Sequence, residues 1–112
     1  MPTPLRLRSS ADIRGVFTAR ASWGSDQVVV HARSRGDGGG ARVAVVAGRR
    51  VGGAVVRNRA KRRMRAVLAS CDLPAGLDLV VSGRAGADSV PFAALEAQIA
   101  DGIRRAGRRA TR

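Results

Sequence analysis

The side chains best placed to do chemistry form one strongly basic stretch. Six of the nine residues from Arg57 to Arg65 are cationic, and no carboxylate occurs between Asp37 and Asp72. An isolated buried cation costs far more free energy than packing could return. The stretch must therefore face water or a polyanion, and the chemistry it indicates is polyanion binding.

Outside this stretch, the reactive side chains form no catalytic pattern. One histidine (His31), one cysteine (Cys71) and eight scattered carboxylates give no acid–base pair, no nucleophile with its base and no metal cluster. The phosphate-loop patterns Gly-x4-Gly-Lys-Ser/Thr and Gly-x-Gly-x-x-Gly are also missing. We therefore expect no catalytic residue and no metal site in the protein itself.

The basic stretch belongs to a predicted helix with one apolar face. At about 100° per residue, the apolar side chains fall within an arc of roughly 80°, which Leu68 extends slightly. These side chains are Val56, Ala60, Met64, Val67 and Cys71. Burying a large apolar side chain stabilises by about 1.5–3 kcal/mol, so this face is expected to dock the helix.

The cationic side chains on the other faces of this helix repel one another. Arg57, Lys61 and Arg65 are spaced four residues apart, and each such like-charge pair costs roughly 0.2–0.5 kcal/mol. A helix face that is merely solvated usually mixes the two signs of charge. Polyanion binding removes the repulsion and releases counterions, which favours a nucleic-acid partner over a solvated face.

Composition limits the class of protein. The chain has 112 residues, 45% of them hydrophobic, and a formal net charge of +13, as expected for one domain with one core and an anionic partner. No apolar run approaches the ~20 residues of a membrane span. The basic helix also lacks the aromatic and leucine content of a membrane-surface helix, so we expect no membrane partner. A single cysteine fits a reducing cytoplasm.

The remaining elements predict an α/β (α+β) sandwich, with three helices on a small, mostly antiparallel sheet of about four strands. A short helix follows Ser9 or Ser10, and the last helix follows Asp88 or Ser89. Strands are predicted at 28–31, 42–47 and 77–81, the first two pairing antiparallel across loop 33–40. We expect a single RNA-binding domain over residues 1–112, with a flexible arm at 1–8 and a frayed basic tail at 104–112.

The stretch from Arg50 to Arg65 resembles the signature of the protein component of bacterial ribonuclease P. That family carries Arg-Asn-Arg followed by Lys-Arg-x-x-Arg on a helix, after the lead-in Lys-Lys-x-Gly-Asn-Ala-Val. Here the chain reads Arg-Val-Gly-Gly-Ala-Val-Val-Arg-Asn-Arg-Ala-Lys-Arg-Arg-Met-Arg. The resemblance extends to Leu7–Phe17 and to the predicted strand that contains Asp78.

The resemblance implies a protein that binds a large catalytic RNA, one protein copy to one RNA, and the precursor tRNA whose 5′ leader that RNA removes. The RNA, with Mg²⁺, performs the hydrolysis. The resemblance also implies a left-handed crossover through the basic helix, against the usual right-handed preference. The alternative is a generic basic RNA-binding module, such as a ribosomal protein, with no enzymatic role. Composition and charge fit both hypotheses, and the motif favours the first.

The resemblance assigns two sets of contacts. Those to the catalytic RNA are Arg57, Asn58, Arg59, Lys61, Arg62 and Arg65, with Arg49 and Arg50 of the lead-in. Those of a cleft for the single-stranded leader are Ile13, Phe17, His31 and Arg57. This chain departs from the family pattern where Ile13 replaces a usual aromatic and His31 stands where an aromatic often lies. A purely structural role for Phe17 and His31 is the alternative.

Overall fold

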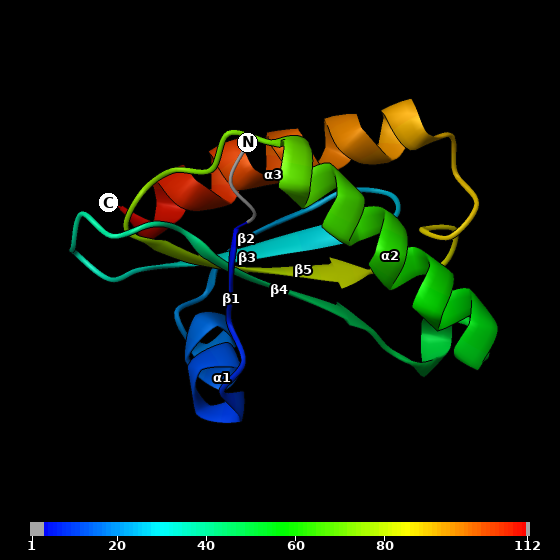
Figure 1. Cartoon of the computed structure of the whole chain (residues 1–112), viewed down its shortest axis with the longest axis horizontal. Coiled ribbons are helices and arrows are strands. Elements are labelled where there is room, and N and C mark those ends of the chain that lie inside the picture. The colour runs from blue at the N-terminus through cyan, green and yellow to red at the C-terminus, as the bar shows by residue number, and fades with distance from the viewer. Residues whose placement is uncertain (1–3, 112) are drawn as a thin grey trace.

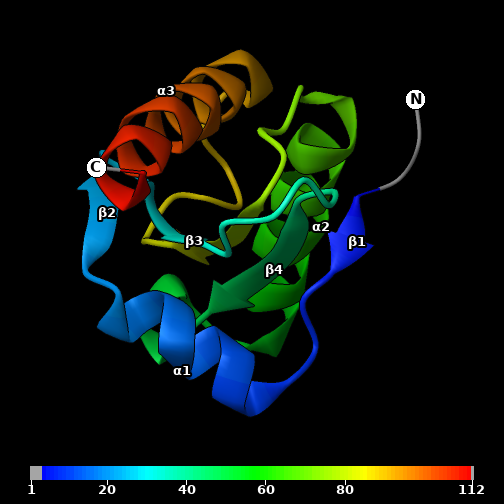
Figure 2. The same cartoon turned by 90° about the vertical axis from the view of Figure 1, so that its left-hand side faces the viewer.

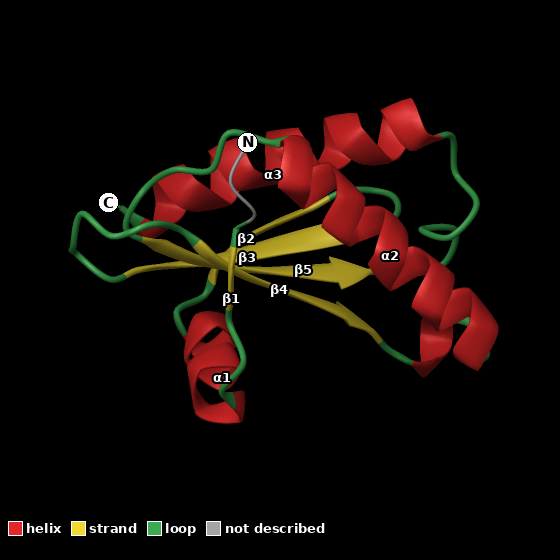
Figure 3. Cartoon of the chain, viewed as in Figure 1, coloured by secondary structure: helices red, strands yellow, loops and turns green. Residues whose placement is uncertain are grey.

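The computed structural model describes residues 4–111, which form five strands, three α-helices and one short 3-10 helix (Figure 1, Figure 3). In chain order the elements are β1 (Leu5–Arg6), α1 (Ser10–Thr18), β2 (Ala21–Gly24), β3 (Val28–Ser34), β4 (Arg42–Ala47), η1 (Arg49–Val51), α2 (Ala54–Ser70), β5 (Leu77–Gly83) and α3 (Phe92–Ala110). The parts of the predicted arm and tail at residues 1–3 and 112 lie outside the described residues.

The strands form one mixed sheet in the order β1-β4-β5-β3-β2. Strand β3 pairs antiparallel with β2 and β5, whereas β4 pairs parallel with β5 and β1. The expected sheet of about four mostly antiparallel strands was therefore wrong in both respects. The predicted pairing of 28–31 with 42–47 was also wrong, because β5 lies between β3 and β4.

The central place of β5 follows from its sequence and its connection. Residues Leu77–Val81 are buried without alternation, which suits a strand covered on both faces. Helix α2 connects the parallel strands β4 and β5, and this is the crossover for which the resemblance implies a left hand. Two hydrophobic layers result. Helices α2 and α3 cover one face of the sheet, and α1 covers part of the other (Figure 2).

The described residues near both ends of the chain are more ordered than predicted. Leu5 and Arg6 pair with β4, and Leu7 is only 5% exposed, so residues 5–8 are not a free arm. Helix α3 continues to Ala110 because Ile103 and Ala106 remain buried against the sheet, so a frayed tail from residue 104 was also wrong.

The helix starts were predicted with mixed success. The Ser9 side chain accepts a hydrogen bond from the Asp12 amide at 3.4 Å, which confirms the predicted cap of α1. Helix α3 begins only at Phe92, after Pro91, because turns occupy the residues before it that were predicted to cap it. Strand β2 was not predicted, since a four-residue edge strand has too short a pattern to detect.

Candidate nucleic-acid interface

Helix α2 is docked by the predicted apolar face. Ala60, Met64, Val67 and Leu68 are buried, with Met64, Val67 and Leu68 in the core beneath α2 and α3. Val56 and Cys71 lie at the two ends of this face and are half-buried. The core contacts therefore use one side of the helix and leave the cationic sides at the surface.

The predicted contact residues of α2 keep their polar groups available. Asn58, Arg59, Arg62 and Arg65 are exposed, and Arg57 and Lys61 are half-exposed. Only Arg59 approaches a carboxylate, with Nη1 4.0 Å from Oδ2 of Asp88. Within residues 4–111 the other five make no ion pair or side-chain hydrogen bond. The charge of the four cations among these five is thus uncompensated, as the sequence predicts for a polyanion-binding surface.

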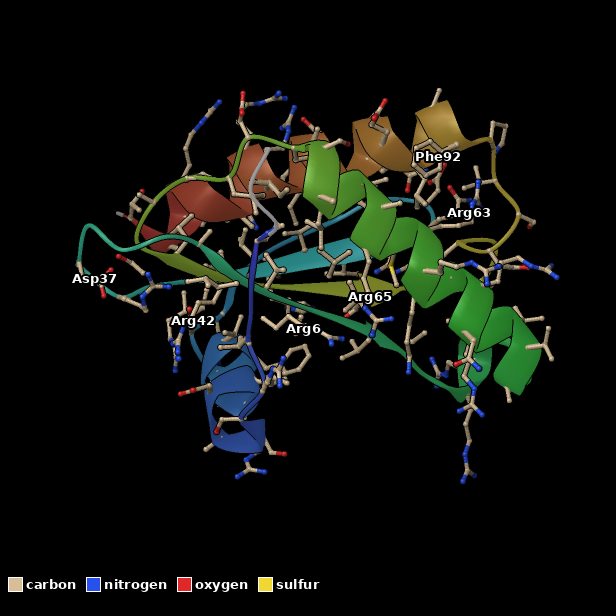
Figure 4. The ribbon with its side chains drawn as sticks, in the orientation of Figure 1. Arg6, Asp37, Arg42, Arg63, Arg65 and Phe92 are labelled. Atoms are coloured by element: carbon tan, nitrogen blue, oxygen red, sulfur yellow. The ribbon has the colours of Figure 1, made fainter. Side chains whose placement is uncertain are left out.

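Arg63 differs from these neighbours. Its guanidinium donates to the carbonyl of Ala87 at 2.8 Å and to that of Val90, and it lies 5.9 Å from the ring centroid of Phe92 (Figure 4). This arginine connects α2 to the loop before α3 and to the first residue of α3. Its guanidinium is therefore engaged in contacts within the protein.

The lead-in to α2 is a fixed turn. Gly52 has φ of 146°, and a Cβ added there would lie 2.9 Å from Cγ1 of Val56, so the turn requires glycine. Val51 is buried beside it, whereas Arg49 and Arg50 are exposed. The turn therefore presents Arg49 and Arg50 just before the first turn of α2.

A groove of about 660 Å³ lies beside this helix and was not predicted from the sequence. It runs between β1, β4 and the C-terminal half of α2, and Arg8 is among its lining residues. Arg6 and Arg65, which also line it, are labelled in Figure 4. Leu7 and Leu68 contribute apolar surface to it. Arg6 and Arg8 reach α2 only because β1 pairs with β4, and nothing in the local sequence indicates that pairing. The cationic surface is therefore wider than the predicted motif.

On the opposite face of the sheet, two predicted leader-cleft residues meet. The rings of Phe17 and His31 lie edge to face, with centroids 4.6 Å apart. Phe17 is 39% exposed, and burial lowers the pKa of His31, which favours the neutral imidazole. Ile13 does not join this pair: it packs against the apolar cluster that contains Val16, and it also lines the groove beside α2. Among the described residues, no hydrogen bond or stacking contact joins Arg57 to this pair.

A second unpredicted feature is a buried carboxylate held by three arginines. Asp78 is 0% exposed and accepts hydrogen bonds from Arg33 at 2.9 Å, Arg35 at 2.7 Å and Arg42 at 2.8 Å. Burial alone would raise the pKa of Asp78, but the bonds from Arg42, Arg33 and Arg35 outweigh it and hold this pKa far below its usual range. The sequence did contain one signal of this buried ionic group, namely an aspartate inside an otherwise apolar strand.

The carboxylates do not fit a Mg²⁺ site. No group of three His, Cys, Asp or Glu residues in the described part of the chain could hold a metal ion. Asp12, Asp37 and Asp78 each face arginine instead, which competes with a cation for their oxygens. Within residues 4–111, every helix falls short of the length and apolar character of a membrane span.

The fold and the site together define a class: small basic α+β proteins that present a cationic helix beside a mixed sheet. A family model described as Ribonuclease P matches residues 1–107, and the chain belongs to this family. The family match confirms the resemblance. It gives the chain a role in tRNA 5′ processing, as the non-catalytic protein component of a ribonucleoprotein endoribonuclease.

Individual proteins show the same similarity. The chain is 31% identical over 103 residues to the ribonuclease P protein component of Brevibacillus brevis, covering 90% of this chain and 82% of the relative. It is 37% identical over 101 residues to that of Acidothermus cellulolyticus, covering 88% and 84%. The solved RNase P protein from Thermotoga maritima matches with a TM-score of 0.74 and 27% identity, over 86% of this chain and 92% of that one. This likeness confirms the α+β fold class.

Proposed function

We propose that this protein binds the catalytic RNA of ribonuclease P through α2 and its lead-in, while α1 and the adjoining sheet hold the single-stranded 5′ leader of precursor tRNA. The observation that carries the proposal is the uncompensated cationic surface of a helix whose apolar face is buried. Family membership supports the identity of the RNA partner.

The contacts to the catalytic RNA are those of an electrostatic interface. Arginine and lysine neutralise phosphates and release counterions, which supplies affinity without reading sequence. Asn58 can both donate and accept hydrogen bonds, so it is suited to a base edge or a ribose hydroxyl. The proposed contact set is Arg49, Arg50, Arg57, Asn58, Arg59, Lys61, Arg62 and Arg65.

The leader contacts rest on the aromatic pair. Stacking of an unpaired base on an aromatic ring contributes about 1–3 kcal/mol and tolerates any base, as a leader of variable sequence requires. Phe17 supplies the half-exposed ring, and the His31 imidazole packs against that ring edge to face. Ile13 and Arg57 complete the proposed leader set, Ile13 through its apolar surface and Arg57 through its charge.

The chemistry of hydrolysis belongs to the RNA. Mg²⁺ supplies charge stabilisation and an activated water when bound by RNA, and the described part of this chain has no donor set suited to it. The partners we propose are one catalytic RNA per protein copy and the precursor tRNA. The compartment we propose is the bacterial cytoplasm, which suits a chain with one half-buried, free cysteine.

Site-specific crosslinking tests this division of labour. Cys71 is the single cysteine, so Cys71→Ala provides a background for Asn58→Cys, Phe17→Cys and the control Ala97→Cys on the exposed side of α3. Each variant carries a photoactivatable crosslinker in the reconstituted complex with precursor tRNA. We expect position 58 to crosslink to the catalytic RNA, position 17 to the leader and position 97 to neither. Equal crosslinking of positions 17 and 97 to the leader would refute the cleft, and no RNA adduct from position 58 would refute the α2 interface.

A further inference from the structure

We infer that Arg33 and Asp78 are positioning residues for the leader cleft, because they fix the place of α1 over the sheet and so the contact of Phe17 with His31. This inference rests on the proposed function of the cleft. It concerns residues outside both predicted contact sets. The group comprises Asp12, Arg33, Arg35, Arg42 and Asp78, which we call the Asp78 cluster.

The cluster begins as a row across three neighbouring strands. Asp78 of β5 is in register with Arg33 of β3 on one side and with Arg42 of β4 on the other. Arg42 donates to both Asp78 oxygens, through Nε at 2.8 Å and Nη2 at 2.8 Å, while Arg33 donates to Oδ2 at 2.9 Å. Such paired, charge-assisted bonds fix the guanidinium planes as well as the distances.

The same two arginines reach up to α1. Arg33 Nη2 lies 3.5 Å from Oδ1 of Asp12, and Arg42 Nη1 lies 3.8 Å from Oδ2 of Asp12. The guanidiniums of Arg33 and Arg42 therefore lie between the Asp12 carboxylate of α1 and the carboxylate of β5. This arrangement holds the first turn of α1 at a set position over β3, β4 and β5.

Gly15 brings the middle of α1 directly onto Arg33. A Cβ built at Gly15 would lie 1.9 Å from Nη1 of Arg33 and 3.0 Å from its Cζ. The helix lies this close to the guanidinium only because residue 15 has no side chain. A larger residue at 15 must therefore move α1 or displace the Arg33 guanidinium, which bonds to Asp78 and lies near Asp12.

The position of α1 in turn determines the cleft. His31 precedes Arg33 by two residues, so both side chains project from the same face of β3. Phe17 follows Gly15 in the same nine-residue helix, so a shift at Asp12 and Gly15 moves its ring relative to His31. The apolar contacts of Val16 also hold α1, but unlike the two ion pairs of Asp12 they do not require a particular partner on the sheet.

The composition of the cluster argues for a role in geometry. Replacing a buried ion pair by apolar residues is often neutral or stabilising, so stability alone does not require one buried carboxylate with three arginines. Two of these arginines also pair with α1, the helix that covers part of this face (Figure 1, Figure 2). Burying the ionic network costs solvation free energy, and we infer that its benefit is a defined position for the helix that carries Phe17.

Gly15→Ala is the most direct test. Alanine forms helices better than glycine, so an effect through helix stability alone would leave the protein as stable or more stable. We expect instead that the affinity of the reconstituted complex for precursor tRNA, relative to mature tRNA, falls about five- to tenfold, the low end for stacking on one base. Affinity for the catalytic RNA should not change. Gly38→Ala is the matched control, since a Cβ there meets nothing within 4 Å and it lies in an exposed loop.

Two outcomes of this test would overturn the inference. The first is an unchanged preference for precursor over mature tRNA in Gly15→Ala. The second is an equal loss of affinity for both tRNAs, which would make α1 a packing element only. If Gly15→Ala lowers the melting temperature, Arg33→Met, which keeps an unbranched stem without the guanidinium, must reproduce the loss of preference for precursor tRNA. Failure of Arg33→Met to do so also overturns the inference. A parent complex with no preference for precursor tRNA would instead refute the proposed cleft itself.

Discussion

The ring of Phe17 on α1 meets the imidazole of His31 on β3 edge to face, with the ring planes at 71° to each other. The contact joins α1 to an inner strand of the sheet. An edge-to-face pair leaves part of the Phe17 ring exposed, where an unpaired base can stack. The most specific predictions concern this contact and the cationic surface on the other side of the sheet.

Phe17→Ala should weaken the binding of precursor tRNA to the reconstituted complex by about 1–3 kcal/mol, because it removes one stacking platform. Mature tRNA, which has no leader, should bind as before. Phe92→Ala is a close control, since Phe92 is also half-exposed, at 43% against 39%, but lies on α3. Equal losses for the two tRNAs in Phe17→Ala would make Phe17 a packing residue. Titration of both tRNAs against both variants decides the point.

Removing Arg57 and Arg59 together should reduce the salt dependence of binding to the catalytic RNA. The slope of log K against log salt falls by about 0.7–0.9 for each phosphate that the protein no longer neutralises. The pair Arg104→Ala and Arg108→Ala removes the same charge from α3, and we expect a smaller change in slope. If both double variants change the slope equally, net charge and not the α2 surface governs binding. Affinity measured across a series of salt concentrations supplies the slopes.

Acid should destabilise the protein partly through Asp78. The pKa of this carboxyl lies below its ordinary value of 3.8 in the folded state. The unfolded chain therefore takes up the proton first, so this stability is complete above about pH 5 and is lost as pH falls toward the lowered pKa.

Asp78→Asn provides the comparison. The variant should lose about 3 kcal/mol of unfolding free energy at pH 7, because it breaks a buried ion pair. The loss lies at the low end for such a change because the arginines left without their partner are partly exposed to water. It should also lose less further stability than the parent as the pH falls from about 5 to about 3. Urea unfolding across this range measures both effects, and parallel pH profiles would contradict the assignment.

The packing of α2 against the core should depend on Met64 and not on the adjacent Arg65. Met64 is fully buried in the core, so Met64→Ala should cost about 2–5 kcal/mol of unfolding free energy. Arg65→Ala at the exposed surface should change it by less than about 0.5 kcal/mol and weaken RNA binding instead. Chemical denaturation together with RNA titration separates the two effects. A similar stability loss for both variants would argue against the buried face described for α2.

The sequence predicted the elements that depend on local pattern. Met64, Val67 and Leu68 recur at helical spacing, and the structure buries all three. The cap at Ser9 was predicted for the same reason, since capping needs only neighbouring residues. The family resemblance, carried by residues 50–65, was confirmed by the family match.

What could not be predicted depends on contacts between distant residues. The pairing of β1 with β4, the insertion of β5 between β3 and β4, and the Asp78 cluster all join segments far apart in the chain. Local patterns do not record such partners, because a strand presents the same alternation whichever neighbour it pairs with. The contact roles assigned to α2 and to the cleft stay predictions.

The most direct test of the central claim is cleavage of precursor tRNA by a bacterial ribonuclease P RNA, with and without this protein, across a Mg²⁺ titration. At low Mg²⁺ we predict that the RNA alone is nearly inactive and that adding the protein restores removal of the 5′ leader. The double variant Arg57→Ala and Arg59→Ala should restore it less well than the parent protein. Absence of stimulation by the parent protein at every Mg²⁺ concentration would contradict the claim that this chain supports the catalytic RNA.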